Sequence, residues 1–256
     1  GDRFFETQLY SIQRDITDHF QKLEGLRREF LGLDDTMHII QEWVCIRRQW
    51  NKDSVEENFL LHSNLITGLL KLVWLVVRRS NQLGLSTSQD RLVSFCFSFW
   101  LSVMETTAQA RGLATHCAVR QENPSEIRSR LKFLHHQLIE LNSEGQSKLA
   151  QLDVTHSNAI SVAIEQAQHV NHLERFISAL NADFCLCSSP KMDADTIYTL
   201  GSHTVSSCQH VLLIVLKLIE RSLSPELKAW VLGQSAQHGA DTSSSETIQK
   251  AVHETG

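Results

Sequence analysis

The segment LVSFCFSFWLSVM, at residues 92–104, is apolar except for three serines. A second segment, LITGLLKLVWLVV at residues 65–77, is apolar except for three positions. A helix that is apolar on all sides is typically buried, in a protein core or in a membrane. We therefore predict two long helices, over residues 54–79 and 88–119, that supply the core of an all-α fold.

A membrane hairpin is the alternative for these two segments. Each apolar run has about 13 residues, whereas a membrane-spanning helix needs about 20. Extending the first run towards its N-terminus brings in His62, Ser63 and Asn64, and the second run ends at Glu105. The lengths favour a buried helix pair, and a membrane- or lipid-associated helical bundle is kept as the second hypothesis.

The scarcity of turn residues extends the helical prediction to the whole chain. The 256 residues include only 3 Pro and 11 Gly, too few for a sandwich or barrel that turns every ~8–12 residues. The predicted architecture is an irregular multi-helix bundle or a short α-solenoid of about eight helices. Besides the two core helices, helices are predicted over residues 4–31, 35–50, 124–142, 193–222 and 225–230, and over a stretch that ends near residue 182.

Breaks in the C-terminal half are placed at polar or proline-containing stretches. Asn123 is predicted to cap a helix whose first residue is Pro124, a position that proline favours. The stretch 142–145, which contains a glycine, is predicted to end that helix. The next helix is predicted to run unbroken to about residue 182, and residues 183–192 to form a loop.

The helix predicted over residues 4–31 carries a long heptad pattern. Such a seam over four repeats is typical of a coiled coil or of a long bundle helix. It predicts packing against another chain or against the rest of this one. The seam consists of Phe5, Leu9, Ile12, Ile16, His19, Leu23, Leu26, Phe30 and Leu33.

The helix predicted over residues 35–50 carries the best candidate for a partner surface. It carries Trp43 and Trp50 two turns apart, with Arg47 between them. Trp and Arg are among the residue types that dominate binding hot spots. Packing in the core is nevertheless the more common role of tryptophans spaced in this way. The heptad seam is the second candidate. The candidate partner-binding residues are Trp43, Trp50, Arg47, Ile39 and Ile46 on the short helix, and Leu9, Ile12, Ile16 and Leu23 on the seam.

Arginine pairs fall near the ends of three predicted helices. A cation in the last turn offsets the negative end of the helix dipole, which is a sufficient structural reason. The functional alternative is a basic patch for an acidic partner or a nucleic acid, formed by Arg27, Arg28, Arg78 and Arg79. The net charge of −5 disfavours nucleic-acid binding by the chain as a whole.

No motif of catalysis or cofactor binding is found. Gly-x-Gly, Walker, Gly-x-Ser-x-Gly and His-Glu-x-x-His patterns are absent from the sequence. Cys185 and Cys187, with later histidines, lack the spacing of a zinc site. His169 and His172 are predicted to lie on a solvated helix face. We therefore predict no catalytic residue, no metal and no cofactor.

The number and placement of the cysteines indicate in which cellular compartment the protein is expected. The six cysteines lie in a chain long enough to form a core without disulfides, and three of them fall within apolar helical stretches. We expect reduced, mostly buried thiols and an intracellular protein, cytoplasmic or nuclear. No basic stretch followed by an apolar run marks a secretion signal near residue 1.

These observations predict a non-enzymatic helical scaffold or adaptor domain. Its partner would be another protein or a second copy of itself, bound through helical packing in a larger intracellular assembly. Membrane association is the alternative, and nucleic-acid binding through the arginine pairs is a further one. We expect a single helical domain over residues 1–232, with lobes at 1–120 and 124–232 as an open alternative, and a flexible polar tail over 233–256.

Overall fold

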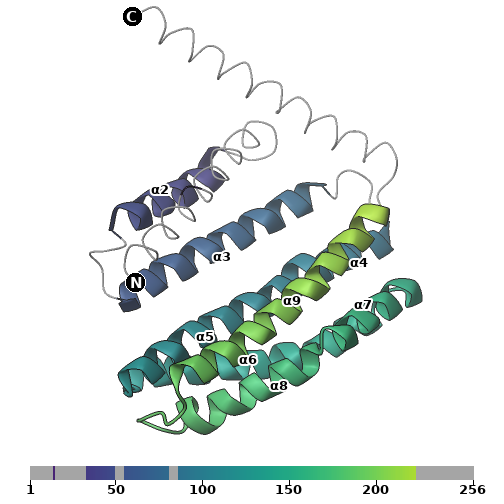
Figure 1. The fold of residues 1–256 in the computed structure, drawn as a ribbon. Coiled ribbons are helices and arrows are strands. Elements are labelled where there is room, and N and C mark those ends of the chain that lie inside the picture. The colour runs from purple at the N-terminus through teal and green to yellow at the C-terminus, as the bar shows by residue number, and fades with distance from the viewer. Residues whose placement is uncertain (1–13, 15–32, 50–54, 81–85, 223–256) are drawn as a thin grey trace, which may run out of the picture. The chain divides into compact units, whose positions relative to one another are not determined.

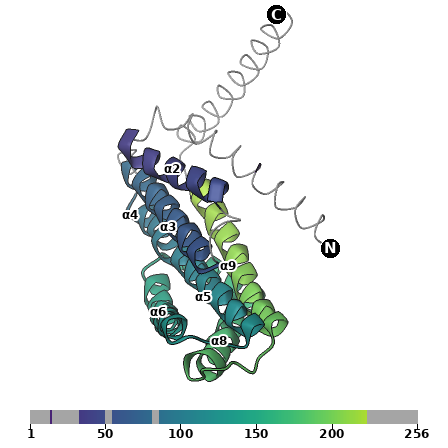
Figure 2. The same cartoon turned by 90° about the vertical axis from the view of Figure 1, so that its left-hand side faces the viewer.

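The computed structural model describes residues 14, 33–49, 55–80 and 86–222. All regular structure within these ranges is helical, and they contain no strand. The prediction of an all-α protein is therefore confirmed for this part of the chain (Figure 1 and Figure 2). The heptad seam up to Phe30, the helix predicted over 225–230 and the polar tail lie outside the described residues.

Several neighbouring elements join into longer helices. The π-helix η2 connects α4 to α5 without a break, and the π-helix η3 continues α8, so the described residues form seven continuous helices. Residues 34–219 make up one compact unit. The elements are α2 (Leu33–Gln49), α3 (Val55–Ser80), α4 (Thr87–Ser94), η2 (Phe95–Trp100), α5 (Leu101–Arg120), α6 (Ser125–Ala150), α7 (Val154–Gln166), α8 (His169–Ala179), η3 (Leu180–Cys185) and α9 (Ala194–Ser222).

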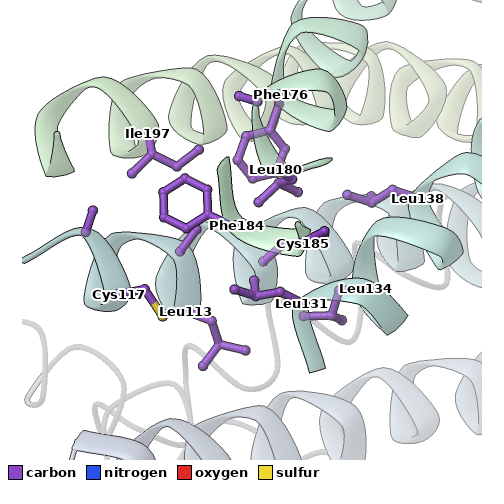
Figure 3. Close-up of a cluster of buried hydrophobic side chains, with 14 of the residues drawn as sticks. Leu113, Cys117, Leu131, Leu134, Leu138, Phe176, Leu180, Phe184, Cys185 and Ile197 are labelled. Carbon is purple, nitrogen blue, oxygen red and sulfur yellow. The ribbon is translucent and has the colours of Figure 1, made fainter. Parts of the chain in front are cut away.

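One of two buried apolar clusters, the first core, joins α5, α6, α8, η3 and α9. Figure 3 shows side chains from these elements converging around Phe176 and Phe184, both of which are 0% exposed. Residues before and after 120–124 both contribute to this cluster. Its most buried large members are Leu131, Leu134, Leu138, Leu173, Phe176, Leu180, Phe184 and Ile197.

The second core lies around η2 and joins it to α6, α7 and α9. The backbone hydrogen bond of a π-helix spans five residues instead of four. In η2 the buried residues are Phe95, Cys96, Phe99 and Trp100. The rings of Phe95 and Phe99 stack with centroids 5.3 Å apart. The aromatic segment at residues 92–104 therefore lies in the core, as predicted. Part of it forms a π-helix, which is wider than the α-helix expected there.

The predicted core helices contribute unequally. The helix predicted over 88–119 spans residues 87–120 and contributes to both cores. The helix predicted over 54–79 forms α3, whose Leu65 and Leu72 are buried but belong to neither cluster. The main partners of the long helix in the core are therefore α6, α8 with η3, and α9.

Gly145 does not end a helix, and that prediction is wrong. α6 continues through it to Ala150. A Cβ atom at Gly145 would lie 2.7 Å from Cζ of Phe99, closer than real carbon contacts allow. The glycine therefore permits the close approach of α6 to η2. In the sequence alone, such a glycine cannot be distinguished from one that ends a helix.

The unbroken helix predicted to run to residue 182 is also wrong. The chain leaves helical geometry at Asp153, which caps α7 by accepting a hydrogen bond from the His156 backbone N–H at 2.9 Å. It bends again at Gln168, which has a φ of 50°. Helical structure then continues to Cys185, past the predicted end. Neither break carries Gly or Pro, and the apolar pattern runs across both.

Gly201 lets α5 approach α9 closely. A Cβ atom there would lie 2.6 Å from Cγ of Arg111 and 2.8 Å from its Cβ. The arginine is held over this spot because its guanidinium donates a hydrogen bond to Ser202 Oγ at 3.0 Å and lies 5.0 Å from the ring centroid of Tyr198. The near end of the arginine side chain therefore cannot move aside easily.

Replacing Gly201 by alanine is expected to lower the free energy of unfolding by about 1–3 kcal/mol, because the methyl group overpacks this contact. Urea unfolding followed by circular dichroism measures the change. Gly112→Ala is the comparison, since its Cβ would meet only the ring edge of Phe59, at 3.1 Å. A Gly201→Ala protein as stable as the original would contradict the close approach.

Candidate functional site

The stripe predicted as a partner surface is mostly buried. On α2, Ile39, Trp43 and Ile46 are 2%, 5% and 1% exposed. Ile39 packs close to α3, because a Cβ atom at Gly68 would lie 3.3 Å from its Cγ1. The burial favours the packing role over the docking role for these three residues. Arg47 is exposed.

The other predicted partner and patch residues are only partly described. Trp50 and the seam residues Leu9, Ile12, Ile16 and Leu23 lie outside the described residues, as do Arg27 and Arg28. Arg47 and Arg48 fall in the last turn of α2, as predicted. Arg78 and Arg79 precede the end of α3 at Ser80. The four-arginine patch therefore stays a prediction.

A cluster of mostly polar side chains lies between α8, α9 and η2, and we call it the histidine centre. It consists of His169, Ser207, Cys208 and Trp100, with His172 and His203 beside them. His169 is 5% exposed, so its predicted place on a solvated face is wrong. Its Nδ1 lies 2.8 Å from Ser207 Oγ. Its ring lies 5.0 Å from the Trp100 ring, whose indole N–H donates to the Cys208 carbonyl at 2.8 Å.

The hydrogen bonds at Ser207 assign the proton of the imidazole. Ser207 donates its one hydroxyl proton to the Thr204 carbonyl at 2.7 Å, so towards His169 the oxygen can only accept. Nδ1 of His169 therefore carries a proton and donates it. This is the reverse of a catalytic pair, in which the histidine accepts the serine proton, and the contact is that of a structural hydrogen bond.

Burial keeps the ionisable groups of the histidine centre neutral. It lowers the pKa of His169 to about 4, and the neighbouring His172 acts in the same direction. Burial also raises the pKa of the Cys208 thiol to about 12. A thiol with that pKa is not a thiolate nucleophile at neutral pH, even though its sulfur lies 3.8 Å from Nδ1 of His169.

The pKa of His169 predicts how stability depends on pH. An unfolded histidine titrates near 6.5, so the unfolded chain takes up this proton before the folded one. The stability contributed by the neutral ring is complete above about pH 6.5 and is lost as the pH falls towards about 4. His169→Asn is expected to make the urea midpoint less dependent on pH between 7 and 5 than in the original chain; equal pH dependence would contradict the assignment.

A second cluster of polar side chains, Ser88, Asp153 and His156, links the start of α4 to the start of α7. Asp153 Oδ2 accepts a hydrogen bond from Ser88 Oγ at 2.5 Å, and His156 Nδ1 lies 2.6 Å from the same oxygen. The Ser88 hydrogen bond is the main reason that the pKa of Asp153 is lowered. Serine and histidine both bind the aspartate and not each other, so this group lacks the order of a catalytic triad.

A buried asparagine joins two distant turns. Asn123 Nδ2 donates to the carbonyls of Phe184 and Cys187, at 2.6 and 2.9 Å, and its backbone N–H donates to Ser188 at 2.9 Å. The predicted capping role of Asn123 is wrong, because Pro124 occupies the N-cap position of α6. The asparagine instead ties the turn after α5 to the end of η3.

Metal ligands do not gather in the described part of the chain. No group of three or more His, Cys, Asp or Glu residues there could hold a metal ion. All six cysteines are free; Cys96, Cys117, Cys185 and Cys208 are buried, Cys187 is half-buried and Cys45 is exposed. The expectation that the thiols are mostly buried is therefore confirmed.

The C-terminal half of α9 is apolar on two sides. Val211 and Val215 are fully buried in the second core, whereas Leu213 and Leu216 are 58% and 37% exposed. We call Leu213 and Leu216 the outer face of α9. Among the described helices, α9 alone is long and apolar enough to cross a membrane by length and composition, and 28% of its most apolar window is buried.

Comparison of the chain with protein-family models, curated proteins and solved structures gives no match. The class of protein supported at this point is an all-α protein with a buried histidine centre and an exposed apolar helix face. Sequence reasoning missed the histidine centre and the outer face. The run from Val211 to Ile219 is apolar except for Lys217, but its period does not show which residues the neighbouring helices cover.

Proposed function

We propose that the chain is a non-enzymatic helical scaffold or adaptor domain of a larger intracellular assembly. It binds another protein, or a second copy of itself, by helix packing. Its architecture would be an irregular bundle or short α-solenoid, with the heptad helix over 4–31 as an additional contact. The observation that carries the proposal is the outer face of α9.

In the C-terminal half of α9, apolar side chains lie on more than one side of the helix, and a side that the core does not cover favours an apolar neighbour. The second core covers Val211 and Val215, but Leu213 and Leu216 lie roughly half a turn away from them and stay exposed. A protein helix laid along this side would bury both leucines, each worth about 1.5–3 kcal/mol when fully removed from water. Such helix-on-helix recognition reads apolar residues spaced three or four apart.

The test replaces both leucines and measures assembly. Leu213→Gln with Leu216→Gln is expected to abolish binding to the partner, or the concentration-dependent rise in mass by light scattering if the partner is a second copy. Leu60→Gln is the matched control, because Leu60 is also a helical leucine and is 53% exposed. A double variant that associates as the original does would refute the role of the outer face.

A membrane- or lipid-associated bundle is the second candidate, because α9 is long and apolar enough to span a bilayer. Insertion of α9 would withdraw Val211 and Val215 from the second core and break the hydrogen bond between Ser207 and His169. That cost favours the protein partner. Liposome flotation at neutral and acid pH distinguishes the two: co-flotation that depends on Leu213 and Leu216 would favour lipid, and its absence would remove the membrane candidate.

A further inference from the structure

Three histidines meet between α8 and α9. His169 is buried and donates to Ser207 of α9. One turn further along α8, the ring of His172 lies 5.3 Å from the ring of His203 on α9. The contact between these two helices therefore includes three imidazole rings, each of which can take up a proton.

The charges around these rings are positive. His203 and Arg175 both lower the pKa of His172, after the effect of burial, and His172 lowers that of His169. The other groups against His169 are neutral: Ser207 and Cys208 from α9 and Trp100 from η2. The carboxylates nearest in sequence, Glu165 on α7 and Glu174 on α8, are exposed; on α5, half-buried Glu105 accepts from Gln109.

We propose that the histidine centre makes the contact between α8 and α9 acid-sensitive, so that proton uptake opens the N-terminal half of α8 away from α9. Charges on His172 and His203 would repel each other across the contact. A charge on His169 would be buried without a carboxylate partner, which proteins rarely tolerate.

The fold favours local opening over complete unfolding. Gln168, with its φ of 50°, already separates α7 from α8 and can act as a hinge. The other end of the helix is fixed, because Phe176, Leu180 and Phe184 lie in the first core and Asn123 binds the carbonyl of Phe184. Opening from the Gln168 end would uncover Trp100 and the neighbouring second core, and of the first core it would withdraw Leu173 while Phe176, Leu180 and Phe184 stay in place.

Hydrogen exchange of the full chain at pH 7 and pH 5, corrected for intrinsic rates, tests the proposal. Amides of residues 172–175, the first that donate within α8, are expected to lose protection by at least about tenfold at pH 5, whereas those of η3 and α6 keep theirs. The double variant His172→Gln, His203→Gln removes the repulsion across the contact but keeps His169, so its loss of protection is expected to be smaller than that of the original chain. His169→Asn keeps a donor for Ser207 without a group that titrates, and is expected to behave in the same way.

His136→Gln is the matched control, because the side chain of His136 on α6 is 73% exposed and lies away from this contact. This variant should respond to acid as the original chain does. Unchanged protection of residues 172–175 at pH 5 would overturn the proposal. Equal loss of protection in every helix, or an undiminished acid response in both histidine variants, would overturn it as well.

Discussion

Replacing Phe184 by alanine is expected to lower the free energy of unfolding by about 3–5 kcal/mol, as for other large aromatic side chains removed from a core. Phe184 is fully buried in η3, where the first core gathers side chains from α5, α6, α8 and α9 around it (Figure 3). The cavity left behind would be shared by all of these helices, so the structure could not close it by moving one side chain.

Phe133→Ala is the control for this measurement. Phe133 lies on α6 and directly precedes Leu134, a member of the first core. The side chain of Phe133 itself is 61% exposed. Its replacement is expected to change stability by no more than about 0.5 kcal/mol. Urea unfolding of both variants gives the comparison. Similar losses for the two phenylalanines would mean that η3 does not occupy the centre of the first core.

Replacing Asn123 by alanine is expected to cost about 2–4 kcal/mol, although the residue is small and polar. Its loss would leave the buried carbonyl of Phe184 and that of Cys187 without their side-chain donor, and each unsatisfied buried group costs about 1–3 kcal/mol. Asn123→Asp isolates the donor, because it keeps the oxygen that accepts from Cys117 Sγ and removes the amide N–H. It should be at least as destabilising at neutral pH.

Asn181→Ala provides the matched control for the asparagine, since Asn181 is exposed in η3, close in sequence to the same turn. It should leave the urea midpoint almost unchanged. The two turns are also linked by Ser189, which donates to the Gln121 carbonyl at 3.1 Å. If Asn123→Ala were no less stable than Asn181→Ala, the link between the turns would have to rest on such surface contacts.

The sequence predicted the helices whose ends coincide with polar or proline-containing stretches. The bounds of α2, α3, the joined α4–α5 helix and α9 agree with prediction to within two residues. In these segments the apolar pattern and the terminating residues give the same answer. The apolar run at 92–104 was correctly interpreted as core because a 13-residue run is too short for a bilayer.

The errors share a physical cause, which is that the deciding contact lies far away in the sequence. Position 145 has no room for a side chain because Phe99 lies against it. His169 is buried where Ser207 of α9 accepts its hydrogen bond. Asn123 finds its partners about 60 residues later. The π-helices were also missed, since their five-residue hydrogen bonds leave a sequence pattern close to that of an α-helix.

The most direct test of the proposed function places a photo-crosslinking residue at position 213 of α9 in the chain expressed in cells. The account predicts a discrete adduct with one protein or with a second copy, lost on Leu216→Gln and absent when the crosslinker is placed at position 60. Light scattering of the purified complex should give the matching mass. No adduct at position 213, together with a monomeric chain that binds neither protein nor liposomes, would contradict the account.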